Sequence, residues 1–326
     1  MFELIQATAP GTTTRGTLDI PGLPDTRLPY VVIRGVEEGP VLLVTAGVHG
    51  AEYASIDAAY LLAGTDPATL RGTLVILPIV NPSAFWQRSI YVCPIDGRNL
   101  NRMFPGRVLG TYSERLAAWL HETFLSRADA LIDLHGGDLV EALAPFSIYV
   151  RDHEPSRQLA LAVGLPHLIA SESRGMTYEV TRTHGIPAII AEASGQGLRG
   201  AGDVDLLRQG VRRAMRHLGL LAGEAGAARN VTEYAGLAWL SAPASGLWHP
   251  CVEAGARVAR GQPLGTLRAL DGRDLQTFHA QDSGTVLFLV TSLAMNEGDP
   301  LIGIGVPAAQ PAPVVTAGGE VGRLEG

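Results

Sequence analysis

The architecture of this chain is most evident in residues 41–53, Val41-Leu-Leu-Val-Thr-Ala-Gly-Val-His-Gly-Ala-Glu-Tyr53. This stretch opens with an apolar run rich in β-branched residues, as buried strands do, then breaks at Gly47 and continues into a helical pattern. His49 and Glu52 are three residues apart where that helix should begin, so both side chains can reach one point. Because imidazole and carboxylate groups bind metal ions, the stretch predicts half of a metal site beside a buried strand.

Short apolar runs alternate with helical patterns through residues 41–220. This alternation predicts an α/β domain with a mixed, largely parallel sheet flanked by helices. In such sheets functional residues gather at the carboxyl ends of strands, and His135 and Glu192 each follow or end an expected strand. The expected strands are 41–46, 73–80, 130–134, 146–150 and 188–191, and the expected helices are 51–63, 113–126, 156–163, 176–183 and 204–220.

The sequence changes character near residue 225, where a linker of small residues at 222–228 leads into short β-like pieces separated by glycines. Their pattern resembles the barrel-sandwich module of biotinyl and lipoyl carriers, which attach their prosthetic group to a lysine. This chain has no lysine, since its 25 Lys-plus-Arg positions are all arginine, so a carrier function is excluded. We therefore expect an α/β domain in 1–225, a small all-β, barrel-sandwich-like domain in 226–306 that is structural or caps the site, and a disordered tail in 307–326.

The composition is that of a soluble globular protein, with 46% hydrophobic residues, 17% charged residues and a net charge of −7. No apolar run reaches the ~20 residues that cross a bilayer, and the N-terminus lacks the pattern of a signal peptide. Cys93 and Cys251 match no zinc or redox spacing, which indicates two reduced thiols in a cytoplasmic protein. No basic run stands out, so we expect no nucleic-acid and no membrane partner; homo-oligomerisation stays open.

Three side chains near the ends of expected strands form a candidate ligand set. His49, Glu52 and His135 supply two imidazoles and one carboxylate, the set used by hydrolytic zinc sites that leave one position open for water. Zinc would lower the pKa of that water to ~7. Asp133 lies two residues before His135 and points the same way on a strand, so it could orient the imidazole; a core or edge aspartate is the alternative.

Further motifs stand beside these ligands: Asn81-Pro82, Asn99-Leu-Asn-Arg-Met-Phe-Pro-Gly106, Asp133-Leu-His135 and Ala191-Glu192. Together with His49-x-x-Glu52, this set resembles the succinylglutamate desuccinylase/aspartoacylase family, which is related to the zinc carboxypeptidases. The resemblance covers about residues 40–200 through its motifs and extends to the C-terminal β domain in architecture. It implies a zinc-carboxypeptidase-like fold in which residues 1–225 form the zinc hydrolase catalytic domain.

The resemblance also implies catalytic roles for matching residues. His49, Glu52 and His135 match the ligands of one Zn²⁺ per chain. Glu192 matches the general base, which takes a proton from water and later hands one to the leaving amine. Arg88 matches the arginine that polarises the scissile carbonyl and holds the developing oxyanion.

Substrate-binding residues follow from the same resemblance. Asn101 and Arg102 match the pair that holds the substrate carboxylate, for which a planar guanidinium is well suited. Arg182 stands where aspartoacylases place a second carboxylate-binding arginine. The sequence departs from the commoner Asp-Leu-Asn-Arg at Asn99 and has a longer insertion after Arg88. In this it is similar to the bacterial subgroup that includes deacetylases of N-acetylated diamino acids from ectoine breakdown.

The resulting expectation is a zinc-dependent amidohydrolase acting on a small N-acyl amino acid, whose acyl group and amino acid the sequence does not name. Two alternatives stay open. The same residues would serve a metallocarboxypeptidase that removes C-terminal residues from short peptides. A non-catalytic binding protein with a vestigial metal site would also carry them.

Overall fold

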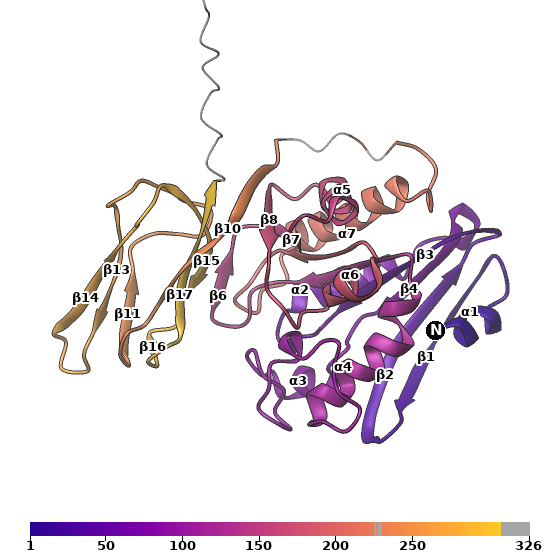
Figure 1. The fold of residues 1–326 in the computed structure, drawn as a ribbon, viewed down its shortest axis with the longest axis horizontal. Coiled ribbons are helices and arrows are strands. Elements are labelled where there is room, and N and C mark those ends of the chain that lie inside the picture. The colour runs from indigo at the N-terminus through magenta and orange to yellow at the C-terminus, as the bar shows by residue number, and fades with distance from the viewer. Residues whose placement is uncertain (225, 227–229, 308–326) are drawn as a thin grey trace, which may run out of the picture.

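The computed structural model describes residues 1–224, 226 and 230–307 (Figure 1). Within these residues the strands form one sheet of 13, in which β6 is a side branch, and a separate sheet of four. The expected linker falls partly outside the described residues, at 225 and 227–229. The expected tail falls outside them from residue 308 onward.

Helices and strands alternate up to residue 217, and strands alone follow. The helices are α1 (Phe2–Ala7), α2 (Tyr53–Leu62), α3 (Pro82–Gln87), α4 (Tyr112–Thr123), α5 (Glu154–Val163), α6 (Glu179–His184) and α7 (Ala201–His217), with 3₁₀ turns η1 (Pro67–Thr69), η2 (Leu100–Arg102) and η3 (Leu125–Arg127). The strands of this part are β1 (Thr12–Ile20), β2 (Leu23–Arg34), β3 (Glu37–Ala46), β4 (Arg71–Leu77), β5 (Ala130–His135), β6 (Glu141–Leu143), β7 (Phe146–Val150), β8 (His167–Ser171) and β9 (Ala188–Glu192). The later strands are β10 (Thr232–Ser241), β11 (Gly246–Pro250), β12 (Arg257–Val258), β13 (Pro263–Arg268), β14 (Asp274–His279), β15 (Gly284–Val290), β16 (Ala294–Met295) and β17 (Pro300–Pro307).

Strands β4, β3, β5 and β9 lie side by side and parallel at the centre of the large sheet. Leu42, Leu43 and Val44 of β3 are all 0% exposed, because both faces of the strand are covered. Antiparallel strands β2 and β1 extend one side, and β7 pairs antiparallel with β9 before β8 pairs parallel with β7. The prediction of a mixed, largely parallel sheet flanked by helices is confirmed.

Two hydrophobic cores lie on the two faces of this sheet. Helices α2, α5 and α7 cover Leu42, Val44 and Ile132, while α4 and α6 cover Leu43 and Leu131 on the other face. Neighbours along β3 alternate between the two cores because successive side chains of a strand point to opposite faces. Each fully buried aliphatic side chain contributes roughly 1.5–3 kcal/mol, so both cores resist a change of register. This register brings the carboxyl ends of β3, β5 and β9 to one edge.

The β-rich region is joined to the α/β part by hydrogen-bonded strands. β10 pairs with β8 and with β17, which continues the large sheet, and β6 pairs with β15. Strands β14, β13, β11 and β16 form the four-stranded sheet. The core of this region includes Trp248, 2% exposed, whose indole Nε1 donates to the Val290 carbonyl at 3.0 Å. The predicted C-terminal β region is present, whereas its division from the rest at residue 225 as a separate domain stays a prediction.

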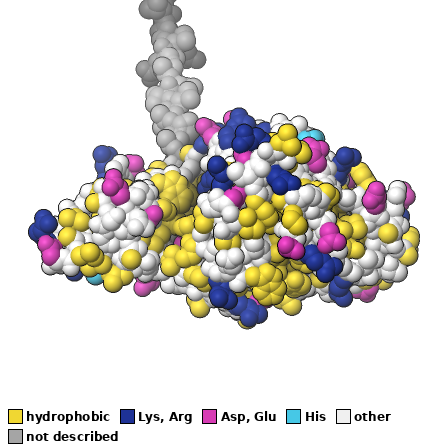
Figure 2. All heavy atoms as spheres, turned by 90° about the horizontal axis from the view of Figure 1, so that it is seen from below, with side chains coloured by type: hydrophobic (Ala, Val, Ile, Leu, Met, Phe, Trp, Pro, Cys, Tyr) yellow, Lys and Arg dark blue, Asp and Glu magenta, His cyan; other side chains and the backbone are white. Residues whose placement is uncertain are grey.

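The outer surface carries charges of both signs. Figure 2 shows one face on which acidic and basic side chains are interspersed and hydrophobic side chains gather near the junction with the β-rich region. Among the described helices, none is long and apolar enough to span a membrane.

Candidate active site

His49, Glu52 and His135 meet at the carboxyl edge of the central strands. His49 follows β3, Glu52 is the residue before α2, and His135 ends β5. One ligand atom from each lies within 4.8 Å of the others. Nδ1 of His49 is 2.6 Å from Oε1 of Glu52, and Nδ1 of His135 is 2.9 Å from Oε2 of the same carboxylate. The two Nδ1 atoms and one carboxylate therefore converge on a single point.

A fixed acceptor orients each imidazole through its other nitrogen. Nε2 of His49 donates to Oδ1 of Asn99 at 3.0 Å, and Nε2 of His135 donates to Oδ2 of Asp133 at 2.7 Å. Asp133 is 0% exposed and also accepts from the hydroxyls of Thr45 and Thr177, each at 2.6 Å. The predicted contact between Asp133 and His135 is confirmed. Asn99, which the sequence marks only as a departure from the commoner motif, orients His49.

The electrostatics of this cluster favour positive charge at its centre. Burial alone would lower the pKa of His49, but the Glu52 carboxylate outweighs it and raises that pKa to about 9. Burial is likewise outweighed at His135, whose pKa is raised well above its usual value by Asp133 and Glu52. Glu52 responds in the opposite sense: burial would raise its pKa, but the two imidazoles lower it to about 2.

This donor set fits a zinc ion. Two imidazole nitrogens and a carboxylate are ligands that zinc accepts, and both rings already have their second nitrogen bound to an oxygen acceptor. Oε2 of Glu52 is buried, and although Nδ1 of His135 lies 2.9 Å away, this oxygen makes no hydrogen bond of regular geometry within the described residues. A dication between the three side chains would supply that oxygen with a partner and replace the imidazole protons that otherwise balance the carboxylate.

Glu192 stands beside the cluster as the last residue of β9, directly opposite His135 on β5. It lines the same cavity as His49 and Glu52. Burial raises the pKa of Glu192 to about 8; the His135 and His49 charges act against this, while Glu52 and Glu141 add to it. The structure thus places the predicted base next to the predicted ligands.

The cavity at this edge has a volume of about 390 Å³. Asn101 and Arg102, in η2, line it as predicted; Oδ1 of Asn101 accepts from the Thr177 amide at 3.0 Å, and Nη1 of Arg102 donates to the Asn101 carbonyl at 2.7 Å. Burial lowers the pKa of Arg102, while Tyr178 and the Glu192 carboxylate act in the opposite direction. The rest of the wall is largely apolar and comes from both parts of the chain: Leu143, Phe146, Ile148, Met176, Ile190, Leu237, Trp239, Phe288 and Pro300.

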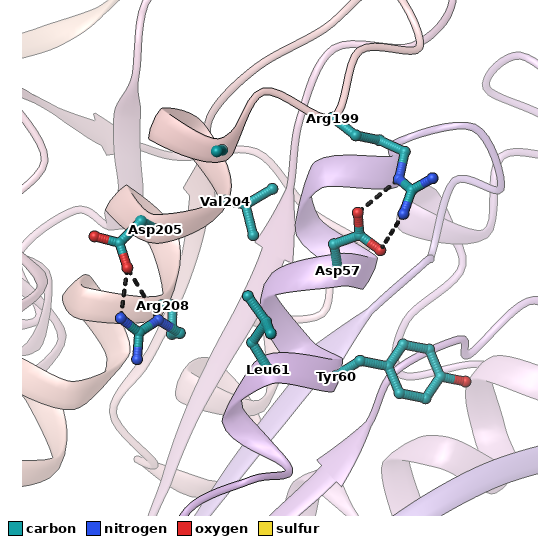
Figure 3. A pocket seen from close by; sticks show the side chains of 8 residues that line it. Asp57, Tyr60, Leu61, Arg199, Val204, Asp205 and Arg208 are labelled. Atoms are coloured by element: carbon teal, nitrogen blue, oxygen red, sulfur yellow. Dashed lines mark hydrogen bonds and ion pairs between the residues drawn. The ribbon is translucent and has the colours of Figure 1, made fainter.

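Two predicted site residues lie away from this cavity. Arg88 directly follows α3, with φ 53°, and lines a neighbouring groove with Tyr53 and Trp86. That groove continues along α2 to the part drawn in Figure 3, where Arg199 forms a two-pronged ion pair with Asp57 at 2.6 and 3.2 Å. The structure does not bring Arg88 to the ligands, and a role for it on substrate stays a prediction.

Arg182, on α6, is engaged by its own neighbours. Its Nη1 lies 2.9 Å from Glu179 Oε2 and donates to the Ser173 carbonyl at 2.9 Å, and its guanidinium sits 5.7 Å from the centre of the Tyr178 ring. It does not line the cavity, so its substrate-binding role also stays a prediction. Tyr234 of β10 is buried, and its hydroxyl lies between His167 and Thr285.

Sequence reasoning missed several cavity residues. Tyr91 and Glu141 line the cavity beside the ligands, and Trp239 lines its apolar part. Burial raises the pKa of Glu141 to about 8, and its Oε1 is buried without a hydrogen-bond partner in the described part of the chain. An acidic residue shortly after the Gly136-Gly137 pair was a usable signal for Glu141. No such signal marked Trp239, because its strand, β10, is distant in sequence from the ligand residues.

Comparison with known proteins agrees with this geometry. Residues 38–218 match the model of the succinylglutamate desuccinylase/aspartoacylase catalytic domain. The chain belongs to this family. Within the family, the N-alpha-acetyl-L-2,4-diaminobutyric acid deacetylase of Halomonas elongata is 30% identical over 203 residues, which are 60% of this chain and 58% of that protein. The match therefore spans less than two thirds of this curated relative.

Solved structures of family members share nearly the whole fold. The product-bound ectoine utilization protein EutE (DoeB) from Ruegeria pomeroyi is 27% identical, with a TM-score of 0.82 over 92% of this chain and 98% of its own. The succinylglutamate desuccinylase/aspartoacylase from Rhodobacter sphaeroides is 24% identical, with a TM-score of 0.81 over 91% and 96%. Both matches extend well beyond residues 38–218 and so include the β-rich region of the fold.

Proposed function

We propose that this chain is a zinc-dependent hydrolase that cleaves the amide bond of a small N-acyl amino acid. The observation that supports this most directly is the presence of ligands, base and carboxylate clamp around one cavity. His49, Glu52, Asn101, Arg102 and Glu192 all line it. The name of the Halomonas elongata relative, a deacetylase of an N-acetylated amino acid, supports a linear amide as the bond that is cut.

The residues divide the chemistry between them. Zinc held by His49, Glu52 and His135 would act as a Lewis acid and lower the pKa of water for attack on the acyl carbonyl. Asp133 keeps Nδ1 of His135 directed at Glu52 by holding Nε2 at 2.7 Å. Glu192 takes the proton of the attacking water and later delivers it to the leaving amine. Burial raises the pKa of Glu192 in the zinc-free chain and a bound dication would lower it, so the two effects together keep this carboxyl able to accept and return a proton near neutral pH.

The substrate carboxylate has a site of its own in this proposal. Arg102 offers a planar guanidinium, and Asn101 offers an amide nitrogen whose companion oxygen is already held by Thr177. The cavity volume of about 390 Å³ lies near the lower end of the roughly 300–1,000 Å³ usual for ligand pockets. A cavity of this size favours a small substrate over a peptide. The walls contributed by β10, β15 and β17 narrow it on the side of the β-rich region.

A hydrolysis screen with zinc restored tests the proposal. The panel contains N-acetyl and N-succinyl amino acids, N-acetylated diamino acids and short peptides, and metal analysis reports zinc per chain. We expect about one zinc per chain and turnover of N-acyl amino acids; turnover of peptides alone would favour a carboxypeptidase. Absence of bound zinc would favour a vestigial site.

Glu192→Gln tests the base. The variant should keep zinc and fold but lose roughly 10²–10⁴-fold in kcat, the usual contribution of a general acid–base group. Glu122→Gln, an exposed residue of α4, is the matched control and should behave as wild type. An active Glu192→Gln variant on the best substrate would show that the proton transfer is assigned to the wrong residue.

A further inference from the structure

Tyr91 lines the same cavity as His49 and Glu192, and nothing in the proposed mechanism uses it. Its ring lies edge-on to the His49 ring, with centroids 6.4 Å apart and an interplanar angle of 83°. Its hydroxyl is buried and has no hydrogen-bond partner among the described residues. A buried phenol normally finds a partner, because leaving the hydroxyl unpaired costs free energy. An oxygen atom of a bound substrate would supply the missing acceptor.

The backbone holds Tyr91 in a conformation that tyrosine rarely adopts. Its φ of 59° lies in the left-handed region, which is unfavourable for a bulky residue. Asp138, 0% exposed, holds it there, since Oδ2 of Asp138 accepts from the Tyr91 amide at 2.8 Å. Asp138 follows His135 by three residues, so the loop that leaves a metal ligand also positions the Tyr91 ring. Maintained strain of this kind is concentrated at functional sites.

The proposed hydrolysis still needs a residue that stabilises the negative charge on the carbonyl oxygen. Attack on the acyl carbonyl builds negative charge on its oxygen, and a donor must be ready there. Arg88, expected for this task, lines the groove of Tyr53 and Trp86. In the described part of the chain Arg102 is the arginine that lines the cavity, and it is committed to the substrate carboxylate. A neutral donor beside His49 fits the requirement.

We propose that Tyr91 is a catalytic residue whose hydroxyl donates a hydrogen bond to the substrate carbonyl oxygen and to the oxyanion formed from it. The proposal rests on the proposed amide hydrolysis. When water adds to the carbonyl carbon, the carbon–oxygen π electrons move onto the oxygen and Tyr91 keeps its proton. When the C–N bond breaks, those electrons return and Glu192 delivers the proton to the amine. The hydrogen bond strengthens as charge develops, so it lowers the barrier more than it tightens substrate binding.

Tyr91→Phe tests this because it removes only the hydroxyl. We expect kcat to fall roughly 100-fold or more, as for one oxyanion donor, with KM within about threefold of wild type. Zinc per chain should not change, and the melting temperature should stay the same or rise, because an unpaired buried hydroxyl has been removed. Binding of a phosphonate analogue of the best substrate should weaken strongly while product binding does not. Comparing the affinities for the analogue and for the product measures the contact between Tyr91 and the oxyanion without any need for turnover.

Tyr60→Phe is the matched control. Tyr60 is 48% exposed and lies in the groove along α2 shown in Figure 3, away from the ligands. Its variant should keep the kcat, zinc content and melting temperature of wild type. Arg88→Gln completes the set, because it removes the competing donor.

The outcomes separate cleanly. A Tyr91→Phe variant that keeps kcat within threefold, or loses activity in step with zinc or melting temperature, overturns the assignment. If Arg88→Gln lost kcat while Tyr91→Phe stayed active, Arg88 instead of Tyr91 would be the residue that stabilises the oxyanion. A wild-type chain that binds zinc but hydrolyses no N-acyl amino acid refutes the proposed function, and the role of Tyr91 falls with it.

Discussion

Replacing Asp133 by asparagine measures how much the metal site depends on the buried carboxylate behind His135. Oδ2 of Asp133 accepts from Nε2 of His135 at 2.7 Å and from the Thr177 hydroxyl at 2.6 Å, and Oδ1 accepts from the Thr45 hydroxyl at 2.6 Å. Asparagine keeps one acceptor oxygen and puts an NH₂ group in the place of the other. If the NH₂ group replaces Oδ1, the Thr45 hydroxyl must rotate to accept from it; if it replaces Oδ2, it faces the Nε2 donor of His135.

The magnitude follows from the burial of this group. Asp133 is 0% exposed, so water cannot repair the mismatch. Losing a hydrogen bond to a charged group costs about 1.5–3 kcal/mol, and a mismatched buried donor costs about 1–3 kcal/mol. We expect the zinc-free variant to lose about 2–3 kcal/mol of unfolding free energy, since these terms overlap. Zinc affinity should fall roughly 10–100-fold, as when the outer partner of a metal-binding histidine is removed.

Two measurements check this prediction. Zinc affinity is obtained by competition with a chromophoric chelator, and unfolding free energy by denaturant titration of the chelated protein. Asp129→Asn is the control: Asp129 is exposed just before β5, and its bond from the Val41 amide, 2.7 Å, can be kept by an amide oxygen. If Asp133→Asn bound zinc within twofold of wild type, the argument that Asp133 holds His135 for the metal would be refuted.

Two further predictions concern protons and the apolar wall. Glu52 raises the pKa of His49 to about 9 in the folded chain, above the 6.5 usual for histidine, so the stability that His49 gives to the zinc-free protein is full below pH 6.5 and is lost as pH rises toward 9. Denaturant titrations of chelated protein should show that fall, whereas zinc affinity should rise over the same window because zinc displaces the protons; the opposite slopes would contradict the charge assignment. Trp239→Ala, which removes a 51% exposed ring packed edge-on to Phe288 at 5.0 Å, should lower kcat/KM roughly tenfold for substrates with a large apolar group and leave N-acetylalanine unaffected. Trp86→Ala, 74% exposed in the neighbouring groove, is its control, and equal losses in both variants would exclude a role of Trp239 in the wall.

The central strands were predictable because they are buried on both faces. The run Val41 to Val44 has no polar residue, and β5 and β9 are apolar apart from Asp133, His135 and Glu192, so length and composition were enough to recognise them. Helix α3 (Pro82–Gln87) was missed, because six residues do not complete two turns of an apolar repeat. The helix expected at 176–183 begins only at Glu179, and the Thr177 amide just before it donates to Oδ1 of Asn101.

The ligand set was predictable for the same reason as the sheet. His135 and Glu192 end neighbouring parallel strands, and the register pairs them directly. A shift of one residue would turn both side chains to the opposite face and bury charge in a core, so the apolar pattern that fixes the strands also fixes the site. Arg88 follows the short helix α3 and Arg182 lies on the short helix α6, both outside that sheet, where the sequence sets no such constraint.

The wall of the cavity depends on a contact that no local pattern encodes. After His135 the chain leaves the central sheet, and β6 pairs with β15, with Glu141 opposite Val290. This pairing holds Glu141 at the cavity and places Phe288 of the same strand in its wall. The loop between β5 and β6 also contains Asp138, which holds Tyr91. The β-rich region therefore acts on the site through β6, because moving β15 would displace one carboxylate, one aromatic wall residue and the loop that sets the Tyr91 conformation.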